Sequence, residues 1–118
     1  MATITRLQKS RRMSQIVQHG STIHLAGQIA DDCAQAIDGQ SQEVFCKIDT
    51  LLAQIGLTKS AIVFAEIWLS DLADFAGFNS AWEAWVDPES PPGRATCQVG
   101  LARAGARIEI LVTASAES

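Results

Sequence analysis

Two charged residues near the end of the chain, Arg94 and Glu109, have types and spacing suited to acid–base chemistry on a small carboxylic acid. Arg94 follows a Pro-Pro-Gly turn and opens an expected strand, and Glu109 lies inside the next apolar strand. A guanidinium group can hold a planar carboxylate through two parallel hydrogen bonds. A glutamate nearby can move a proton or orient a water molecule. The strand pair therefore predicts an acid-binding group together with a candidate base.

Each of these residues also has a structural interpretation. Arg94 could be an exposed arginine at the start of a strand, and Glu109 could form a salt bridge with Arg107 or with Arg94 itself, because an unpaired buried carboxylate is costly. Cys97 is expected to be a buried small hydrophobic residue rather than a nucleophile. The three tryptophans are expected to anchor the core or an interface.

The elements that must position these residues follow from periodicity and turn residues. Apolar residues at helical spacing, from Val44 to Ile55, predict a first helix that ends at Gly56. Asp71 is a candidate cap for a second helix over residues 72–86. Strands are expected at residues 3–7, 15–18, 22–26, 61–69, 94–99 and 107–113, with Gly20 turning the hairpin between the second and third.

The element order β-β-β-α-β-α-β-β predicts an α+β fold with both helices on one face of the sheet. The strand at residues 61–69 is largely apolar on both faces, and Ile62, Phe64 and Trp68 are expected on the face without helices. That face needs a cover, and further copies of the same chain are the expected source.

Composition limits the possible functions. The chain has 118 residues, which fits one domain over residues 1–118, and its net charge of −4 argues against a binder of nucleic-acid phosphates. Three cysteines without CxxC spacing predict neither a disulfide framework nor a zinc site. We expect no metal site, no secretory signal and no membrane span, and a cytoplasmic location.

At this point the chain resembles the RidA/YjgF family of small trimeric proteins. The resemblance covers residues 15–114 and rests on an ordered set of motifs: Leu25-Ala26-Gly27-Gln28, Ser70 to Ala76, Asn79, Trp82-Glu83-Ala84-Trp85, Pro92-Gly93-Arg94 and Ile108-Glu109-Ile110. It implies a chorismate-mutase-like α+β fold, a homotrimer and sites between subunits. Deaminating members hydrolyse reactive enamines and imines to 2-keto acids and ammonia, without a cofactor.

The resemblance also implies roles for individual residues. Arg94 would bind the substrate carboxylate, and Glu109 would orient the attacking water. Gly27 would border the ligand with its backbone, and Phe75 and Asn79 would line the site. Thr96 takes the place of the family's reactive cysteine, and a cysteine stands one residue later, at Cys97, on the other face of the strand.

Two further departures lie at the expected site. Met13 stands where the family has a tyrosine, and Ala26 stands where it has a serine. The anion-binding arginine is therefore kept while polar groups around the reacting carbon are not, as in a divergent subgroup.

We therefore carry two hypotheses from different classes. The first is a cofactor-free hydrolase of the 2-iminobutanoate/2-iminopropanoate deaminase type, acting in the control of damaged metabolites. The second is a non-catalytic regulatory trimer that binds a small carboxylate. RNA cleavage, which the resemblance also leaves open, is disfavoured by the acidic composition and the absence of an aromatic and basic face.

Overall fold

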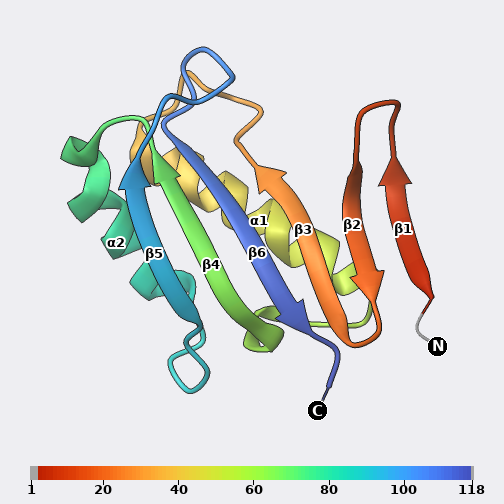
Figure 1. The fold of residues 1–118 in the computed structure, drawn as a ribbon. Helices are drawn as coiled ribbons and strands as arrows, with labels where there is room; N and C mark the ends of the chain where they lie inside the picture. The colour runs from red at the N-terminus through yellow and green to blue at the C-terminus, as the bar shows by residue number, and fades with distance from the viewer. Residues whose placement is uncertain (1–2, 118) are drawn as a thin grey trace.

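The structure, a computed structural model, describes residues 3–117 as a six-stranded sheet with two α-helices on one of its faces (Figure 1). The strands are β1 Ile4–Lys9, β2 Ser14–His19, β3 Thr22–Gln28, β4 Ile62–Leu69, β5 Gly93–Gln98 and β6 Ile108–Ser115, and the helices are α1 Ile37–Gln54 and α2 Phe75–Trp85. Two short 3₁₀ turns, Lys59–Ala61 and Leu72–Asp74, precede β4 and α2. The predicted element order and the α+β class are confirmed.

The strand order is β1-β2-β3-β6-β4-β5, so the last strand of the chain lies in the middle of the sheet. All neighbouring strands are antiparallel except β4 and β5, which run parallel. Two parallel strands need a long crossover, and α2 supplies it. This crossover places α2 beside the edge strand β5, where the candidate arginine lies (Figure 1).

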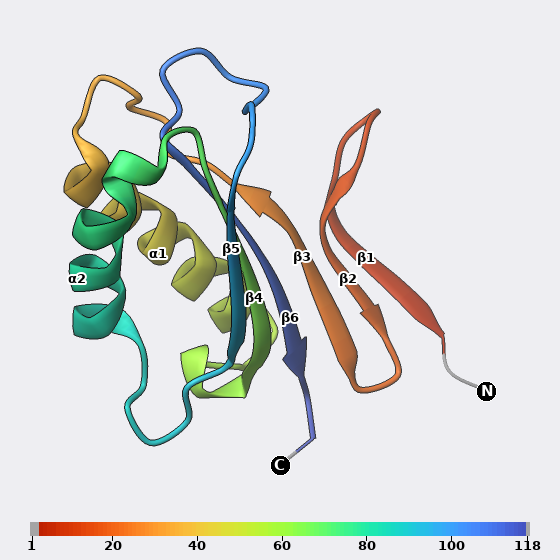
Figure 2. The same cartoon turned by 60° about the vertical axis from the view of Figure 1, so that its left-hand side comes forward.

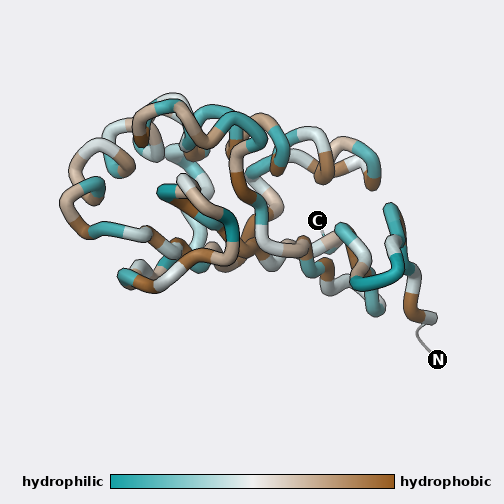
Figure 3. Tube along the Cα trace, turned by 90° about the horizontal axis from the view of Figure 1, so that it is seen from above, coloured by the Kyte–Doolittle hydropathy of each residue, from teal (hydrophilic) through white to brown (hydrophobic). Residues whose placement is uncertain are grey.

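The core fills the space between the sheet and the helices, and Figure 2 shows both helices on the same side. Seen from above, the helices form one layer and the strands another, with hydrophobic and hydrophilic positions alternating along the chain (Figure 3). The largest fully buried apolar side chains come from both layers: Phe78, Ile16, Ile23, Ile48, Leu52, Ile67, Leu69, Ile108, Ile110 and Val44. Every second residue of β6 is buried, which is the pattern of a strand covered on one face.

The predicted turn residues act as expected, but the predicted helix cap, Asp71, caps a 3₁₀ turn instead of the α-helix. Gly20 and Gly56 have φ of 63° and 73°, the left-handed conformation that glycine adopts without a steric cost. The Asp71 carboxylate accepts a hydrogen bond from the Ala73 N–H at 2.9 Å. This cap holds the 3₁₀ turn before α2, so the α-helix begins at Phe75 rather than at Leu72 as the sequence predicted.

The prediction for Ile62 was wrong. Its side chain is only 5% exposed and belongs to the core under the helices, not to the face without helices. The pairing of β4 with β6 shifts by one residue between Ile62 and Phe64, so the strict alternation of sides breaks there. Phe64, at 41% exposure, lies beyond the shift and was placed correctly on the open face.

The carboxamide of Gln40 joins three parts of the chain inside the core. This fully buried side chain donates to the carbonyl oxygens of Cys33, Gln35 and Gly105, and its own oxygen accepts from the Arg107 N–H at 2.9 Å. The loop before α1 and the loop before β6 are therefore both fastened to the first turn of α1. Each of these polar groups is satisfied, as buried polar groups usually are.

Candidate functional site

Arg94 lies between β5 and α2, with its guanidinium group among aromatic rings. The guanidinium carbon is 5.3 Å from the ring centroids of Phe78 and Trp82 and 5.9 Å from that of Phe75. Such contacts stabilise the cation by about 0.5–2 kcal/mol each, depending on exposure. Among residues 3–117, Arg94 has no ion pair and no side-chain hydrogen bond. Its five N–H donors are therefore free for a ligand anion.

The rings around Arg94 come from one face of α2. Phe75, Phe78, Asn79 and Trp82 follow the i, i+3, i+4, i+7 spacing of a single helical stripe. The carboxamide oxygen of Asn79 is buried and has no hydrogen-bond partner within the described chain. A buried acceptor without a donor is costly, so this atom is suited to a donor brought by a ligand.

Thr96 shares a side of β5 with Arg94. The two residues are two positions apart, and their pairing partners Ala65 and Ile67 both point into the core under the helices. Gln98 follows on the same side, and its side-chain oxygen accepts the Leu72 N–H at 2.8 Å. The start of the α2 segment is thus tied to the end of β5.

Glu109 lies on the other face of the sheet, against the backbone of Gly27. A methyl group added at Gly27 would overlap the Glu109 carboxylate, so only glycine leaves room for that carboxylate at this position. The pairing of β3 with β6 is irregular between Leu25 and Gln28, which sets Gly27 opposite the glutamate. Gly27 therefore lies directly beside the Glu109 carboxylate, and its predicted contact with a ligand stays a prediction.

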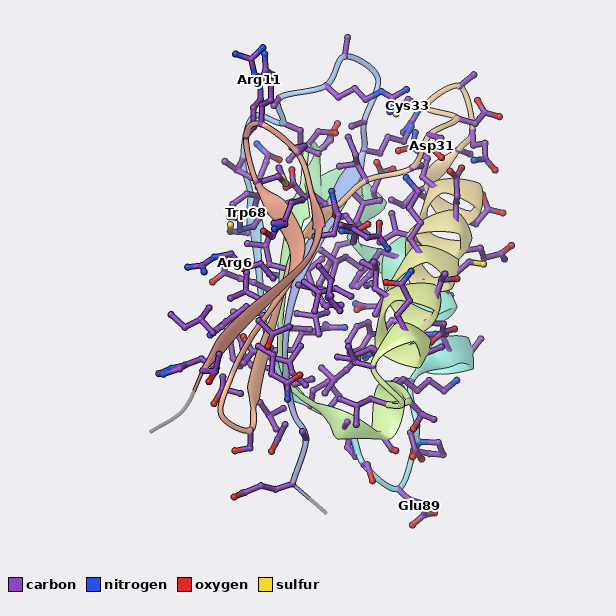
Figure 4. The ribbon with its side chains drawn as sticks, turned by 90° about the vertical axis from the view of Figure 1, so that its right-hand side faces the viewer. Arg6, Arg11, Asp31, Cys33, Trp68 and Glu89 are labelled. Carbon is purple, nitrogen blue, oxygen red and sulfur yellow. The ribbon has the colours of Figure 1, made fainter. Side chains whose placement is uncertain are left out.

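The surroundings of Glu109 are partly desolvated. Trp68 pairs directly with Glu109 across the strands, and Figure 4 shows Trp68 on the side of the sheet away from α1. Loss of water around the carboxylate raises the pKa of Glu109 above its ordinary value of 4.5. Neither predicted salt bridge forms within the described chain, because Arg107 pairs with Asp74 at 3.2 Å and Arg94 lies on the other face.

The structure thus divides the predicted site residues into two groups. Arg94, Phe75, Asn79 and Thr96 lie on the helix side, and Gly27 and Glu109 lie on the open face. The expectation that one strand pair carries both charged groups was wrong, because β4 lies between β5 and β6 in the sheet. The two groups also lie on opposite faces, so they do not meet within one chain. A site that uses both must be built from two copies.

The positions that depart from the family pattern lie at the same end of the sheet. Met13 is 52% exposed in the turn between β1 and β2, and Ala26 precedes Gly27 in β3. Cys97 pairs with Trp68 on the open face and is exposed, so the expectation of a buried thiol was wrong, while its placement opposite to Thr96 was right. A separate hollow of about 470 Å³ beside α1 contains none of the predicted site residues.

Comparison with known proteins shows the family to which the chain belongs. A family model described as endoribonuclease L-PSP matches residues 3–116. A RutC family protein of Haemophilus influenzae is 41% identical over 114 residues, covering 96% of this chain and 98% of that protein. The chain belongs to the YjgF/RidA family. The RutC family protein YoaB of Escherichia coli K12 is 36% identical over 113 residues, covering 96% of this chain and 98% of that protein.

Solved structures of the YjgF/RidA family share the fold closely. NMB1025 of Neisseria meningitidis, a member of the YjgF protein family, has a TM-score of 0.94 and 32% sequence identity, covering 98% of this chain and 97% of that one. Within residues 3–117 no helix is long and apolar enough to cross a membrane. Over the same residues no three histidine, cysteine or acidic side chains gather as metal ligands would.

Sequence reasoning missed the aromatic surroundings of Arg94. Trp82 was assigned to the core or an interface, yet its ring and that of Phe78 also contact the guanidinium group. The helical spacing with Phe75 and Asn79 was a usable signal, because residues on one stripe face the same neighbour. The partner of that stripe could not be read from spacing, since it depends on where β5 lies in the sheet.

Proposed function

We propose that this YjgF/RidA-family chain hydrolyses small enamine or imine acids to 2-keto acids and ammonia. Water adds to the imine carbon and forms a C–O bond, the nitrogen takes up a proton, and the C–N bond then breaks to release ammonia. The carbonyl product keeps the carboxylate of the substrate. Such substrates are already electrophilic once protonated, so orientation and a proton path suffice, and no metal or cofactor is required.

The observation that carries this proposal is the free guanidinium of Arg94. Its charge is unpaired in the described chain, and its position is fixed by three rings. Aromatic rings attract the cation without using its N–H donors, so the fork stays available for a bidentate contact with a carboxylate. Arg94 is thus assigned to the substrate carboxylate, with Thr96 and Asn79 as polar neighbours and Phe75 as the apolar wall.

Glu109 is assigned to the attacking water. The absence of a side chain at Gly27 leaves room for the Glu109 carboxylate. Because Glu109 lies on the face opposite to Arg94, the glutamate of the working site must come from a neighbouring copy. A homotrimer, the typical assembly of the family, places the helix side of one chain next to the open face of another and builds three such sites.

A second candidate function is a carboxylate-binding trimer without turnover. Met13 and Ala26 favour it, because they remove polar groups from positions expected near the reacting carbon. Here a 2-keto acid would bind at Arg94 and change the stability of the trimer or the behaviour of a partner. Both functions share the anion contact and differ only in the chemical step.

The test measures keto acid and ammonia release in an assay in which an amino-acid oxidase generates imines in place. Wild type is compared with Arg94→Ala and with Arg94→Lys, which keeps the charge but loses the planar fork. We expect acceleration over buffer by wild type, and a loss of at least about tenfold in kcat/KM for both variants. Calorimetric binding of pyruvate or 2-oxobutyrate that needs Arg94, without any turnover, would favour the second function instead.

A further inference from the structure

Exposed apolar side chains stand beside the free guanidinium of Arg94, at the start of the α2 segment. Phe75 is 39% exposed although its ring lies 5.9 Å from the guanidinium carbon, and Leu72, one turn earlier, is 51% exposed. These two side chains therefore expose apolar area to water next to the proposed anion site. Single exposed apolar residues are ordinary, but two that continue a binding stripe form a surface.

The backbone that carries these side chains is fixed. The Leu72 N–H donates to Gln98 at 2.8 Å, and the next N–H, that of Ala73, donates to Asp71 at 2.9 Å. Gln98 lies on the same side of β5 as Arg94, four residues further along the strand. The apolar wall therefore runs along the edge of β5, from Phe75 beside the guanidinium to Leu72 beside Gln98.

This placement bears on which acids fit. A ligand that binds Arg94 through its carboxylate and extends along β5 past Thr96 would have Phe75 and Leu72 beside it. Polar groups along this path are few: Thr96 offers one hydroxyl, and Gln98 offers its amide N–H donors, because its oxygen already accepts the Leu72 N–H. An apolar wall rewards the burial of methylene groups and offers nothing to a short or polar side chain.

We infer that this site selects imino or keto acids with a branched or extended apolar side chain, such as those derived from leucine, over those derived from alanine or serine. Leu72 and Phe75 are the residues that set this preference. The inference rests on the proposed function only in placing the ligand carboxylate at Arg94. The predicted preference applies to the binding of keto acids as well as to the turnover of imines, so it can be tested even if the chain is not a catalyst.

The turnover experiment compares imines generated from L-leucine and from L-alanine. We expect kcat/KM to be at least about tenfold higher for the leucine-derived imine, the size typical of discrimination by an apolar pocket. Leu72→Ala is expected to reduce the leucine-derived value about fivefold and the alanine-derived value less than about twofold. Leu72→Met, which keeps the apolar volume, should retain the preference. Ile4→Ala is the matched control, because it shortens a similarly exposed apolar residue on β1, 45% against 51% for Leu72, and should change neither value.

The binding experiment uses calorimetric titration with 4-methyl-2-oxopentanoate and pyruvate. We expect the branched acid to bind about tenfold more tightly to wild type and to lose most of that advantage in Leu72→Ala. If no imine is hydrolysed, the proposed hydrolase activity fails while this ratio still decides the inference. Equal affinities in wild type, or equal losses for both acids in Leu72→Ala, overturn the inference and leave the proposed activity standing.

Discussion

Arg94 and Glu109 lie on opposite faces of the sheet, three residue pairs apart along β4. Arg94 pairs with Ala65, and Glu109 pairs with Trp68. Side chains alternate between faces along a strand, so an odd separation places the two groups on different sides. No rotamer carries either group through the sheet. Joint action of the two residues therefore requires a second copy of the chain.

The first prediction is complementation between inactive variants. Trimers are mixed from Arg94→Ala and Glu109→Gln chains, exchanged to equilibrium and assayed for keto-acid release. Each site takes its arginine from one chain and its glutamate from a neighbour, so random mixing makes about one quarter of the sites complete. We expect about a quarter of wild-type activity from the mixture, although each variant alone is nearly inactive. A mixture no more active than its two components would contradict a shared site.

A second prediction concerns the close contact between Gly27 and Glu109. Gly27→Ala introduces a methyl group where the carboxylate now lies, and the flexible glutamate must move away. We expect kcat/KM to fall at least about tenfold, because a displaced catalytic group loses its alignment, while the melting temperature changes little. Gly100→Ala is the matched control, since an added methyl group there meets nothing within 4 Å. Unchanged activity in Gly27→Ala would show that Glu109 takes no part in the chemical step.

The third prediction is a pH dependence set by Glu109. Desolvation raises its pKa above 4.5, so the carboxylate takes up its proton at a higher pH than a free glutamate does. In the proposed substrate complex the bound carboxylate would offset the charge of the neighbouring Arg94, so kcat, which reports that complex, is the quantity to measure. If the ionised form orients the water, kcat falls as pH decreases through this raised pKa. We expect the midpoint above 4.5, and we expect Glu109→Gln to remove this limb of the profile. A midpoint at or below 4.5 would contradict the prediction.

A fourth prediction addresses assembly through the open face. Phe64→Asp places a charge on an apolar residue that is 41% exposed in the isolated chain. Burying a charge without a partner is costly, so we expect light scattering to show monomers and calorimetry to show no keto-acid binding. Gln42→Asp adds the same charge to an exposed position of α1 and should leave the trimer intact. A stable wild-type monomer at micromolar concentration would contradict the assumption that the open face is covered by other copies of the chain.

The sequence predicted the elements well because each is marked by a local signal. Gly20 and Gly56 mark a turn and a helix end, and both have the positive φ that such places require. The failures occurred where the signal is not local. Ile62 was placed on the wrong face, because the irregular pairing between β4 and β6 is a property of two strands that lie far apart in the sequence.

The candidate site was predicted as a set of residues but not as an arrangement. Residues two positions apart in a strand lie on the same face, so spacing alone places Arg94 and Thr96 on one face, as the structure has them. Spacing does not give the side of Arg94 relative to Glu109, because that depends on the register of β5 and β6 against β4. The aromatic rings around Arg94 were missed for a similar reason. They come from the crossover helix α2, and the position of α2 depends on the order of the strands in the sheet.

The buried carboxamide of Gln40 has a consequence for how reliably Glu109 reaches its side of the sheet. Its oxygen accepts the N–H of Arg107, the residue immediately before β6. A slip of β6 by a single residue would exchange its two faces and turn Glu109 toward the helices. Such a slip would also take the Arg107 N–H away from its acceptor and leave Gln40 unsatisfied in the core. Gln40, a helix residue distant in sequence from the glutamate, thus favours the one alignment of β6 in which the carboxylate lies on the face away from the helices.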